Sequence, residues 1–214
     1  MAQPRLDWAL EEAVRGSGCP TCTLLRQDEQ RFWDGFLYER FQDPEVFGEA
    51  RASLGFCARH TAQLSASRDV VPGATIALAA TQGALSLLAS PRPRRRLWRG
   101  SSETPACAVC ARLRRTQDVV LRELDRQLAR GGALAEAYAA SVGVCVDHVT
   151  AARRLGVERG DVLEAPTRRA LEAAARELDD LLASFDYRRA PASPEMVAAW
   201  HRAIPLLRGD PGAV

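Results

Sequence analysis

The sequence contains no lysine and no asparagine, and all 29 of its basic residues are arginine. Together with the abundant alanine, this usage is typical of a GC-rich bacterial genome, so we give the preference for arginine no functional weight. Basic and acidic residues nearly balance, 29 against 27, which excludes a polycation built to coat nucleic acid. The 214 residues are 47% hydrophobic and 26% charged, which excludes wholesale disorder and a polytopic membrane protein.

Signals for export are also missing. The first residues, MAQPRLDWALEEAVRG, carry acidic side chains where a secretory signal needs an apolar run, and no lipidation motif is present. Six cysteines in 214 residues are too few for a disulfide scaffold. We therefore expect a cytoplasmic protein with reduced thiols, in which cysteines more often bind metal or carry out redox chemistry than form structural bridges.

The cysteines and histidines form two sets with the same spacing. Each set has a CxxC pair, an interval of 34 residues and a CxxH pair. The eight positions are Cys19, Cys22, Cys57 and His60 in the first set, and Cys107, Cys110, Cys145 and His148 in the second. Each residue of the second set follows its counterpart by 88 positions. Four positions that recur at one offset indicate an internal duplication.

Each repeat reads as four helical pieces. Apolar residues at 25, 32, 33 and 36 follow the helical period, which predicts a long helix from the CxxC pair to about Phe41, or to about Arg130 in the second repeat. A return helix ends near Leu54, a short helix begins at the CxxH pair, and a fourth helix starts at Pro72 or Pro166. Because few stretches alternate between apolar and polar residues, we expect no sheet.

These elements predict an all-α fold with two tandem metal-clamped helical units and a C-terminal helical tail. The expected boundaries are 1–90 for the first unit, 91–106 for an Arg/Pro-rich linker, 107–184 for the second unit and 185–214 for a tail packed on the core. After the CxxH pair the offset between the repeats grows to 94, which indicates a six-residue insertion before the fourth helix.

The ligand types predict the chemistry. A helical hairpin of 34 residues would return each CxxH pair to the CxxC pair of its own repeat. Three thiolates and one imidazole make a closed tetrahedral set, which is typical of structural zinc, because catalytic zinc keeps one position open for water. We expect two zinc ions, one per unit. An iron–sulfur cluster is the main alternative, and zinc whose thiolates oxidise and release the ion is another.

The motifs CPTC…FQDPEV…LGFCARH and CAVC…VGVCVDH, with the late Phe185-Asp186-Tyr187-Arg188 segment and Trp200-His201-Arg202-Ala203-Ile204, resemble an uncharacterised bacterial family. That family shows paired CPxC…GFCxxH motifs and a C-terminal DYR segment followed by a helix of the W-x-R-A-I kind. The similarity covers nearly the whole chain, and Ala108 departs from it at the expected proline. The resemblance implies a metal-binding helical fold, and it implies no activity because the family has none assigned.

The linker is rich in arginine and holds one tryptophan. These residues could contact phosphates, with the indole stacked on a base, but a solvated joint between two units is the simpler interpretation. The residues in question are Arg92, Arg94, Arg95, Arg96, Trp98 and Arg99.

From Val70 to Pro91 the chain carries no charged residue, a length that raises the question of a membrane span. The corresponding stretch of the second repeat, Pro166 to Ser184, is charged and amphipathic. We therefore expect a helix buried near the interface between the units, and no membrane partner. His201, the only histidine outside the two sets, is expected to be a surface or packed residue.

No nucleophile–base pair, phosphate-binding glycine loop or spare carboxylate–histidine group occurs, so we do not expect an enzyme. The sequence favours a zinc-binding helical scaffold or adaptor that binds a protein partner, in an unknown oligomeric state. A redox sensor or electron-transfer protein is the first alternative, and a nucleic-acid-binding regulator that uses the arginine-rich linker is the second.

Overall fold

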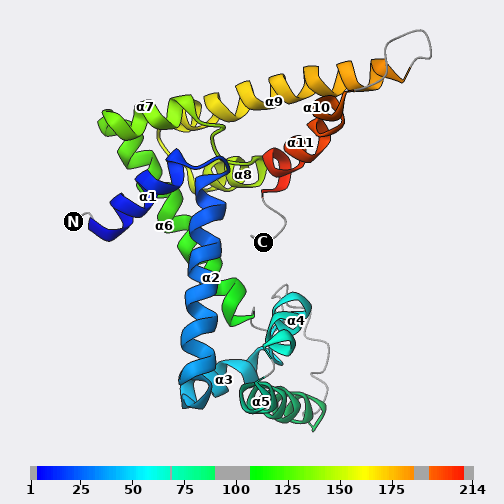
Figure 1. The fold of residues 1–214 in the computed structure, drawn as a ribbon. Coiled ribbons are helices and arrows are strands. Elements are labelled where there is room, and N and C mark those ends of the chain that lie inside the picture. Colours follow the sequence, from blue (N-terminus) through cyan, green and yellow to red (C-terminus); the bar gives the residue numbers. More distant parts are fainter. Residues whose placement is uncertain (1–3, 68, 90–106, 186–192, 210–214) are drawn as a thin grey trace, which may run out of the picture. The chain divides into compact units, whose positions relative to one another are not determined.

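The computed structural model describes residues 4–67, 69–89, 107–185 and 193–209, and within these ranges every regular element is a helix (Figure 1). The expected all-α fold is therefore confirmed. The arginine-rich linker, with Arg92, Arg94, Arg95, Arg96, Trp98 and Arg99, lies outside the described residues, as does Tyr187.

The two repeats give the same order of helices. The first comprises α2 (Pro20–Tyr38), the short 3-10 helix η1 (Arg40–Gln42), α3 (Pro44–Ala52), α4 (Ala58–Ala66) and α5 (Val70–Ala89). The second comprises α6 (Ala108–Arg130), α7 (Ala133–Ala140), α8 (Val146–Leu155) and α9 (Gly160–Ser184). Outside the repeats lie α1 (Pro4–Arg15), α10 (Pro194–Val197) and α11 (Ala199–Arg208).

The chain divides into two compact units that cut across the repeats. The first unit combines residues 1–27 with 116–214, and the second is formed by residues 28–115. The expected boundaries, 1–90 and 107–184, differ from these because the two long helices α2 and α6 each begin in one unit and end in the other. Each compact unit therefore contains the CxxC pair of one repeat and the CxxH pair of the other.

Local signals explain where several helices begin. Asp43 caps α3, where its carboxylate accepts a hydrogen bond of 2.9 Å from the Glu45 amide, and Pro44 follows at the first helical position. The fourth helix of each repeat begins earlier than predicted, at Val70 and Gly160 rather than at the prolines. Pro72 still lies in the first turn, where its missing N–H costs no helical hydrogen bond.

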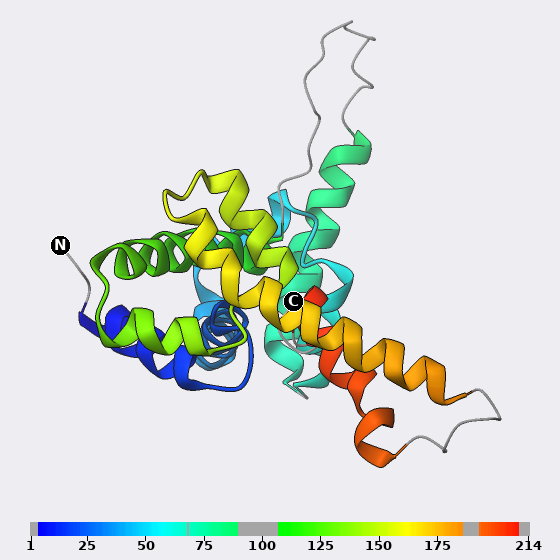
Figure 2. The ribbon, with the colours of Figure 1, turned by 90° about the horizontal axis from the view of Figure 1, so that it is seen from above.

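The core of the first unit is built from α1, α2, α6, α7, α8 and α9. Leu10 and Val14 of α1 are buried in it beside Leu121 and Leu124 of α6. Helix α1 was not predicted from the sequence, although its apolar residues follow the helical spacing. The Tyr138 hydroxyl donates a buried hydrogen bond of 2.7 Å to the Leu163 carbonyl, which ties α7 to α9. Helices α10 and α11 pack along α9 (Figure 2).

The core of the second unit is aromatic. Phe32, Trp33 and Phe36 on α2 meet Phe56, which precedes α4, with ring centroids 5.2 to 6.3 Å apart. Most of these pairs are edge-to-face, a geometry that adds about 0.5–1.5 kcal/mol per pair beyond the burial of area. The cluster fixes α2 against the segment that carries Cys57 and His60.

Helix α5 is less buried than predicted. It packs on α3 and α4 through Pro72, Ile76, Ala79 and Gly83, but its opposite face is exposed. By length and composition it is the one helix of the described ranges that could cross a membrane, and 22% of its apolar window is buried. Gly83 is required by this packing, since a Cβ there would lie 2.1 Å from the Arg51 carbonyl oxygen.

Candidate metal centres

All eight predicted ligands meet in two groups, but the groups combine the repeats. The first, here called the buried centre, consists of Cys19, Cys22, Cys145 and His148. The second, here called the half-buried centre, consists of Cys57, His60, Cys107 and Cys110. The expected grouping, with each CxxH pair beside the CxxC pair of its own repeat, is therefore wrong. The presence of one ligand set in each compact unit agrees with two metal-clamped units.

Helix lengths explain the exchanged grouping. At 1.5 Å per residue, the 19 residues of α2 advance about 28 Å, whereas the 9 residues of α3 return about 14 Å. In the second repeat the 23 residues of α6 advance about 35 Å and the 8 residues of α7 return about 12 Å. Each return helix is thus too short to bring its CxxH pair back, and the pair meets the CxxC pair of the other repeat.

Each ligand pair sits at the start of a helix. Cys57 and Cys145 are the N-cap residues of α4 and α8, with almost the same backbone angles, φ −66° and ψ 166° or 163°. His60 and His148 follow one turn later, so that their rings face the preceding sulfur. The free N–H groups at a helix start stabilise a thiolate, which is the form of cysteine that binds metal.

In the buried centre the imidazole of His148 lies against three sulfur atoms. Its Nδ1 is 3.4 Å from the sulfur of Cys19, 3.5 Å from that of Cys22 and 3.1 Å from that of Cys145. The sulfurs of Cys22 and Cys145 are 3.8 Å apart. All four residues are buried, with exposed fractions of 9% or less.

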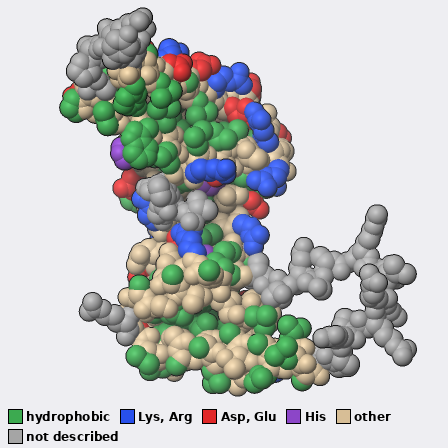
Figure 3. Space-filling model, turned by 90° about the vertical axis from the view of Figure 1, so that its right-hand side faces the viewer, with side chains coloured by type: hydrophobic (Ala, Val, Ile, Leu, Met, Phe, Trp, Pro, Cys, Tyr) green, Lys and Arg blue, Asp and Glu red, His purple; other side chains and the backbone are tan. Residues whose placement is uncertain are grey.

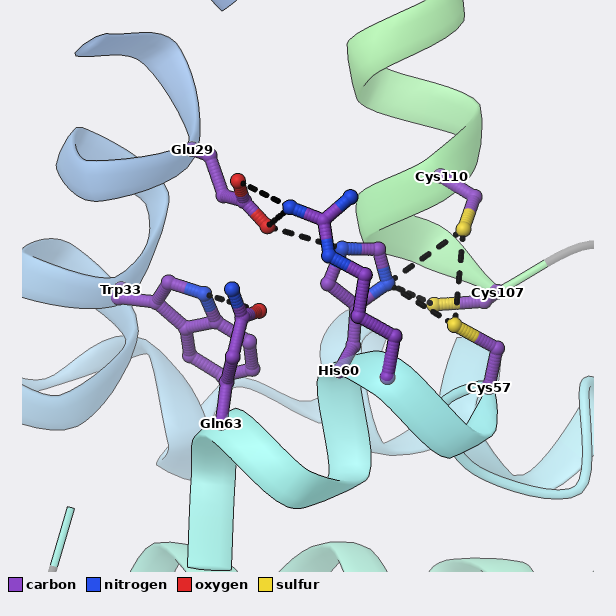
Figure 4. Close-up of polar contacts among 8 residues, drawn as sticks. Glu29, Trp33, Cys57, His60, Gln63, Cys107 and Cys110 are labelled. Atoms are coloured by element: carbon purple, nitrogen blue, oxygen red, sulfur yellow. Dashed lines mark hydrogen bonds and ion pairs between the residues drawn. The ribbon is translucent and has the colours of Figure 1, made fainter. Parts of the chain in front are cut away.

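The half-buried centre repeats this geometry, as Figure 4 shows. Nδ1 of His60 lies 3.1 Å from the sulfur of Cys57 and 3.4 Å from each sulfur of Cys107 and Cys110. The sulfurs of Cys57 and Cys110 are 3.7 Å apart. His60 and Cys107 are buried, whereas Cys57 and Cys110 are partly exposed.

The spacing of the donor atoms fits one tetrahedral ion. With metal–sulfur and metal–nitrogen bonds of about 2.3 and 2.0 Å, a tetrahedron has edges of about 3.8 Å between sulfurs and about 3.5 Å between sulfur and nitrogen. The observed sulfur separations of 3.7 and 3.8 Å match, and they are far from the ~2.05 Å of a disulfide. Within each group all four donor atoms lie within 4.8 Å of one another. Both groups can therefore bind a metal ion.

The crowded sulfurs oppose one another's ionisation. In the buried centre, burial raises the pKa of Cys19, but hydrogen bonds from the thiols of Cys145 and Cys22 outweigh it and hold that pKa well below its usual range. Hydrogen bonds with Cys145 and Cys19 raise the pKa of Cys22. In the half-buried centre, burial and the charges of Cys107 and Cys57 raise the pKa of Cys110 to about 12. A divalent cation supplies the positive charge that lets all three sulfurs act as thiolates.

A carboxylate orients the histidine of the half-buried centre. The second ring nitrogen of His60, Nε2, lies 3.1 Å from Oε1 of Glu29 (Figure 4). Arg59 donates hydrogen bonds of 3.2 Å to Oε1 and 3.0 Å to Oε2 of the same carboxylate. Glu29 is 4% exposed. Burial and the Arg59 charge lower the pKa of His60, although Glu29 opposes this, which keeps the ring neutral and able to bind metal. No such carboxylate contacts His148 among the described residues.

The C-terminal helix covers the buried centre. Gly209 ends α11 with a positive φ of 75°, and a Cβ at this position would lie 2.5 Å from the sulfur of Cys22 and 3.5 Å from that of Cys145. A glycine is needed there both for the backbone angle and for the close approach. The predicted tail thus packs against the buried centre, a contact that no spacing in the sequence predicts.

His201, the remaining predicted residue that the structure describes, lines a cavity of about 550 Å³ together with Cys19 and Cys145 of the buried centre. His201 is exposed, and its ring lies tilted by 32° against that of Trp200, with centroids 3.6 Å apart. Sequence reasoning missed Glu29 and Gly209, and it missed Asp28, whose carboxylate accepts hydrogen bonds of 3.0 and 2.7 Å from Arg112 and joins α2 to α6 within the second unit. Acidic residues are common on helices, so the roles of Glu29 and Asp28 are visible only in the folded structure.

Comparisons of the chain with protein-family models, with curated proteins and with solved structures found no match. The resemblance to the bacterial family with paired CPxC…GFCxxH motifs therefore stays a prediction.

Proposed function

We propose that the protein is a helical scaffold for protein–protein interaction, held together by two structural zinc ions of the Cys3His type. The observation that carries the proposal is the spacing of the donor atoms, which suits one tetrahedral ion in each group. All four positions of such an ion are filled by protein side chains. This leaves no position for a substrate or an activated water, which supports a structural role over a catalytic one.

The donor spacing favours a single ion over an iron–sulfur cluster. The protein ligands of a cluster are distributed over different iron atoms, which places them further apart than donors that share one ion. The 4.8 Å limit within each group is short for that arrangement. Among single ions, closed thiolate and imidazole sets are most often occupied by zinc.

The exchanged ligands give the ions a specific structural task. Each ion would join the CxxC pair of one repeat to the CxxH pair of the other, so that metal binding and the association of the repeats become one event. Zinc sites of this kind contribute about 10–16 kcal/mol in small peptides, which is comparable to the stability of a whole domain. A rigid helical surface that depends on metal in this way suits an adaptor.

A redox role for the half-buried centre is a second candidate. It rests on the partial exposure of Cys57 and Cys110, whose sulfurs are 3.7 Å apart. Hydrogen peroxide would oxidise the two thiolates to one disulfide, two protons would be taken up, two waters would form and the zinc would be released. The buried centre lacks this exposure.

Elemental analysis with an absorption spectrum, on protein purified without air, tests the main proposal. We expect about two zinc per chain and a colourless solution. His60→Ala should bind one zinc, whereas the matched control His201→Ala, which changes the exposed histidine, should keep both. Iron with acid-labile sulfide and a brown colour would overturn the proposal, as would zinc content that His60→Ala leaves unchanged.

A further inference from the structure

The outward face of α5 is apolar and has no partner among the described residues. Val71, Leu78, Leu85 and Leu88 are exposed by 61, 54, 60 and 80%. The helix carries no charged residue along its whole length. In the lower part of Figure 3, over α5, green and tan side chains form the surface and almost no blue or red is seen.

The exposed residues follow the spacing of a coiled-coil seam. Positions separated alternately by three and four residues run along the outward face, and all of them are exposed. We call them the α5 seam; they are Val71, Ala74, Leu78, Thr81, Leu85 and Leu88. Such spacing places one continuous row of side chains where a second helix can pack against it.

The second repeat shows that the fold does not require this apolar face. The positions equivalent to the α5 seam, 94 residues later on α9, are also exposed. They are Ala165, Arg168, Glu172, Ala175, Asp179 and Leu182. Three of the six are charged, as is normal for a solvated face. The apolar α5 seam is thus a property of one repeat alone, which indicates a contact that α9 does not make.

We propose that the α5 seam binds the α5 seam of a second copy of this chain, with the two helices antiparallel. In this orientation Val71 faces Leu88, Ala74 faces Leu85 and Leu78 faces Thr81 of the other copy. Each of the larger side chains Leu78 and Leu85 then meets a smaller one, so the face is complementary to itself. That is the requirement for a two-fold symmetric interface.

A groove beside α5 offers room for the partner's side chains. It encloses about 570 Å³ between α4, α5 and the segment around Gly55, and Ala74 and Ala77 form part of its wall. The partner's Leu85, which faces Ala74 in the antiparallel pair, would enter this groove. The small residues of the seam in one copy thus leave space that the leucines of the other copy fill.

The expected dimer is weak, because a contact along one 20-residue helix is about 30 Å long. It buries less than the roughly 800 Å² per partner of a standard interface. We therefore expect a dissociation constant on the order of micromolar. The inference does not depend on the metal: a monomer with two zinc ions would contradict it and leave the proposed function intact.

Sedimentation equilibrium of the full chain, from about 1 to 100 µM, tests the dimer. The informative variant gives α5 the charges of α9: Ala74→Arg, Leu78→Glu and Leu85→Asp combined. We expect the unchanged chain to approach the dimer mass and the variant to bind at least about a hundredfold more weakly. Leu182→Glu, on the exposed face of α9, is the matched control and should dimerise normally. A monomer throughout the range, or an undisturbed dimer of the triple variant, overturns the proposal.

A charge exchange tests the orientation. Ala74→Arg or Leu85→Glu alone should abolish the dimer, whereas the two together should restore it, because each arginine then faces a glutamate of the other copy. A parallel pair would bring arginine against arginine, and the double variant would stay monomeric. Flotation with anionic vesicles tests the other possible partner of the α5 seam. A chain that stays monomeric in solution, floats with the vesicles and no longer floats when the seam carries charges would show that the seam binds a lipid surface, which overturns the proposed dimer.

Discussion

The two candidate metal centres each combine three cysteines and one histidine on equivalent helices, yet their surroundings differ. The C-terminal helix α11 ends against the buried centre, with Gly209 close to the sulfurs of Cys22 and Cys145. The half-buried centre has partly exposed sulfurs and, in return, a buried carboxylate, Glu29, behind its histidine. Duplication therefore copied the candidate ligands but not their surroundings, and the sulfurs of Cys57 and Cys110 are more exposed than those of the buried centre.

The largest expected effect separates the two units. Cys145→Ser should remove one ligand of the buried centre and destabilise the first unit by several kcal/mol. Hydrogen exchange followed by mass spectrometry should show lost protection in α8 and α11, while α4 keeps its protection. Cys57→Ser should give the reverse pattern. If either variant increased hydrogen exchange equally in both units, the two units would unfold together rather than independently.

A smaller loss of stability is expected from a change at Gly209, the glycine that packs against the buried centre but has no counterpart among the residues described at the half-buried centre. Gly209→Ala places a methyl group 2.5 Å from the sulfur of Cys22, at a φ of 75°. We expect a cost of about 2–3 kcal/mol in unfolding by urea. Gly131→Ala is the control, since it shares a positive φ of 72° but its Cβ meets no atom within 4 Å. Equal losses in both variants would show that backbone strain alone acts at position 209.

The carboxylate behind His60 provides the next contrast. Glu29→Gln should lower zinc affinity at the half-buried centre by about 10–100-fold, because the imidazole loses its charged acceptor. The buried centre should be unaffected. Glu39→Gln, at an exposed position on the same segment, should leave both affinities unchanged. Competition with a coloured chelator measures the two sites, and a loss at both would contradict the assignment of Glu29 to one centre.

The smallest effect is one of rate. Under excess chelator or dilute peroxide, zinc should leave in two phases, with the faster phase from the half-buried centre. His60→Ala should remove the fast phase and His148→Ala the slow one. A single phase from unchanged protein would show that the partial exposure of Cys57 and Cys110 gives no kinetic advantage.

The sequence was enough to single out the eight candidate ligands, because four of them recur at an offset of 88, which is visible without any knowledge of the fold. It could not assign them to centres. In a duplicated chain both groupings satisfy the same spacing, and only the unequal lengths of α2 and α3 decide between them. The roles of Glu29 and Gly209 could not be predicted for a related reason, since each contacts a residue far away in the chain. The exposure of α5 escaped prediction because an apolar, uncharged helix is normally buried.

The exchanged grouping also sets an order of events during synthesis. The half-buried centre is complete once Cys110 has left the ribosome, whereas Cys19 and Cys22 must wait for Cys145 and His148. At about 5–20 residues per second, the first thiols remain without their partners for several seconds or more. The second unit, residues 28–115, can fold before the first unit, because residues 1–27 still lack the residues after 115 with which they form that unit. The newborn chain is therefore most exposed to oxidation and to the wrong metal at its first CxxC pair, the one that ends up best protected.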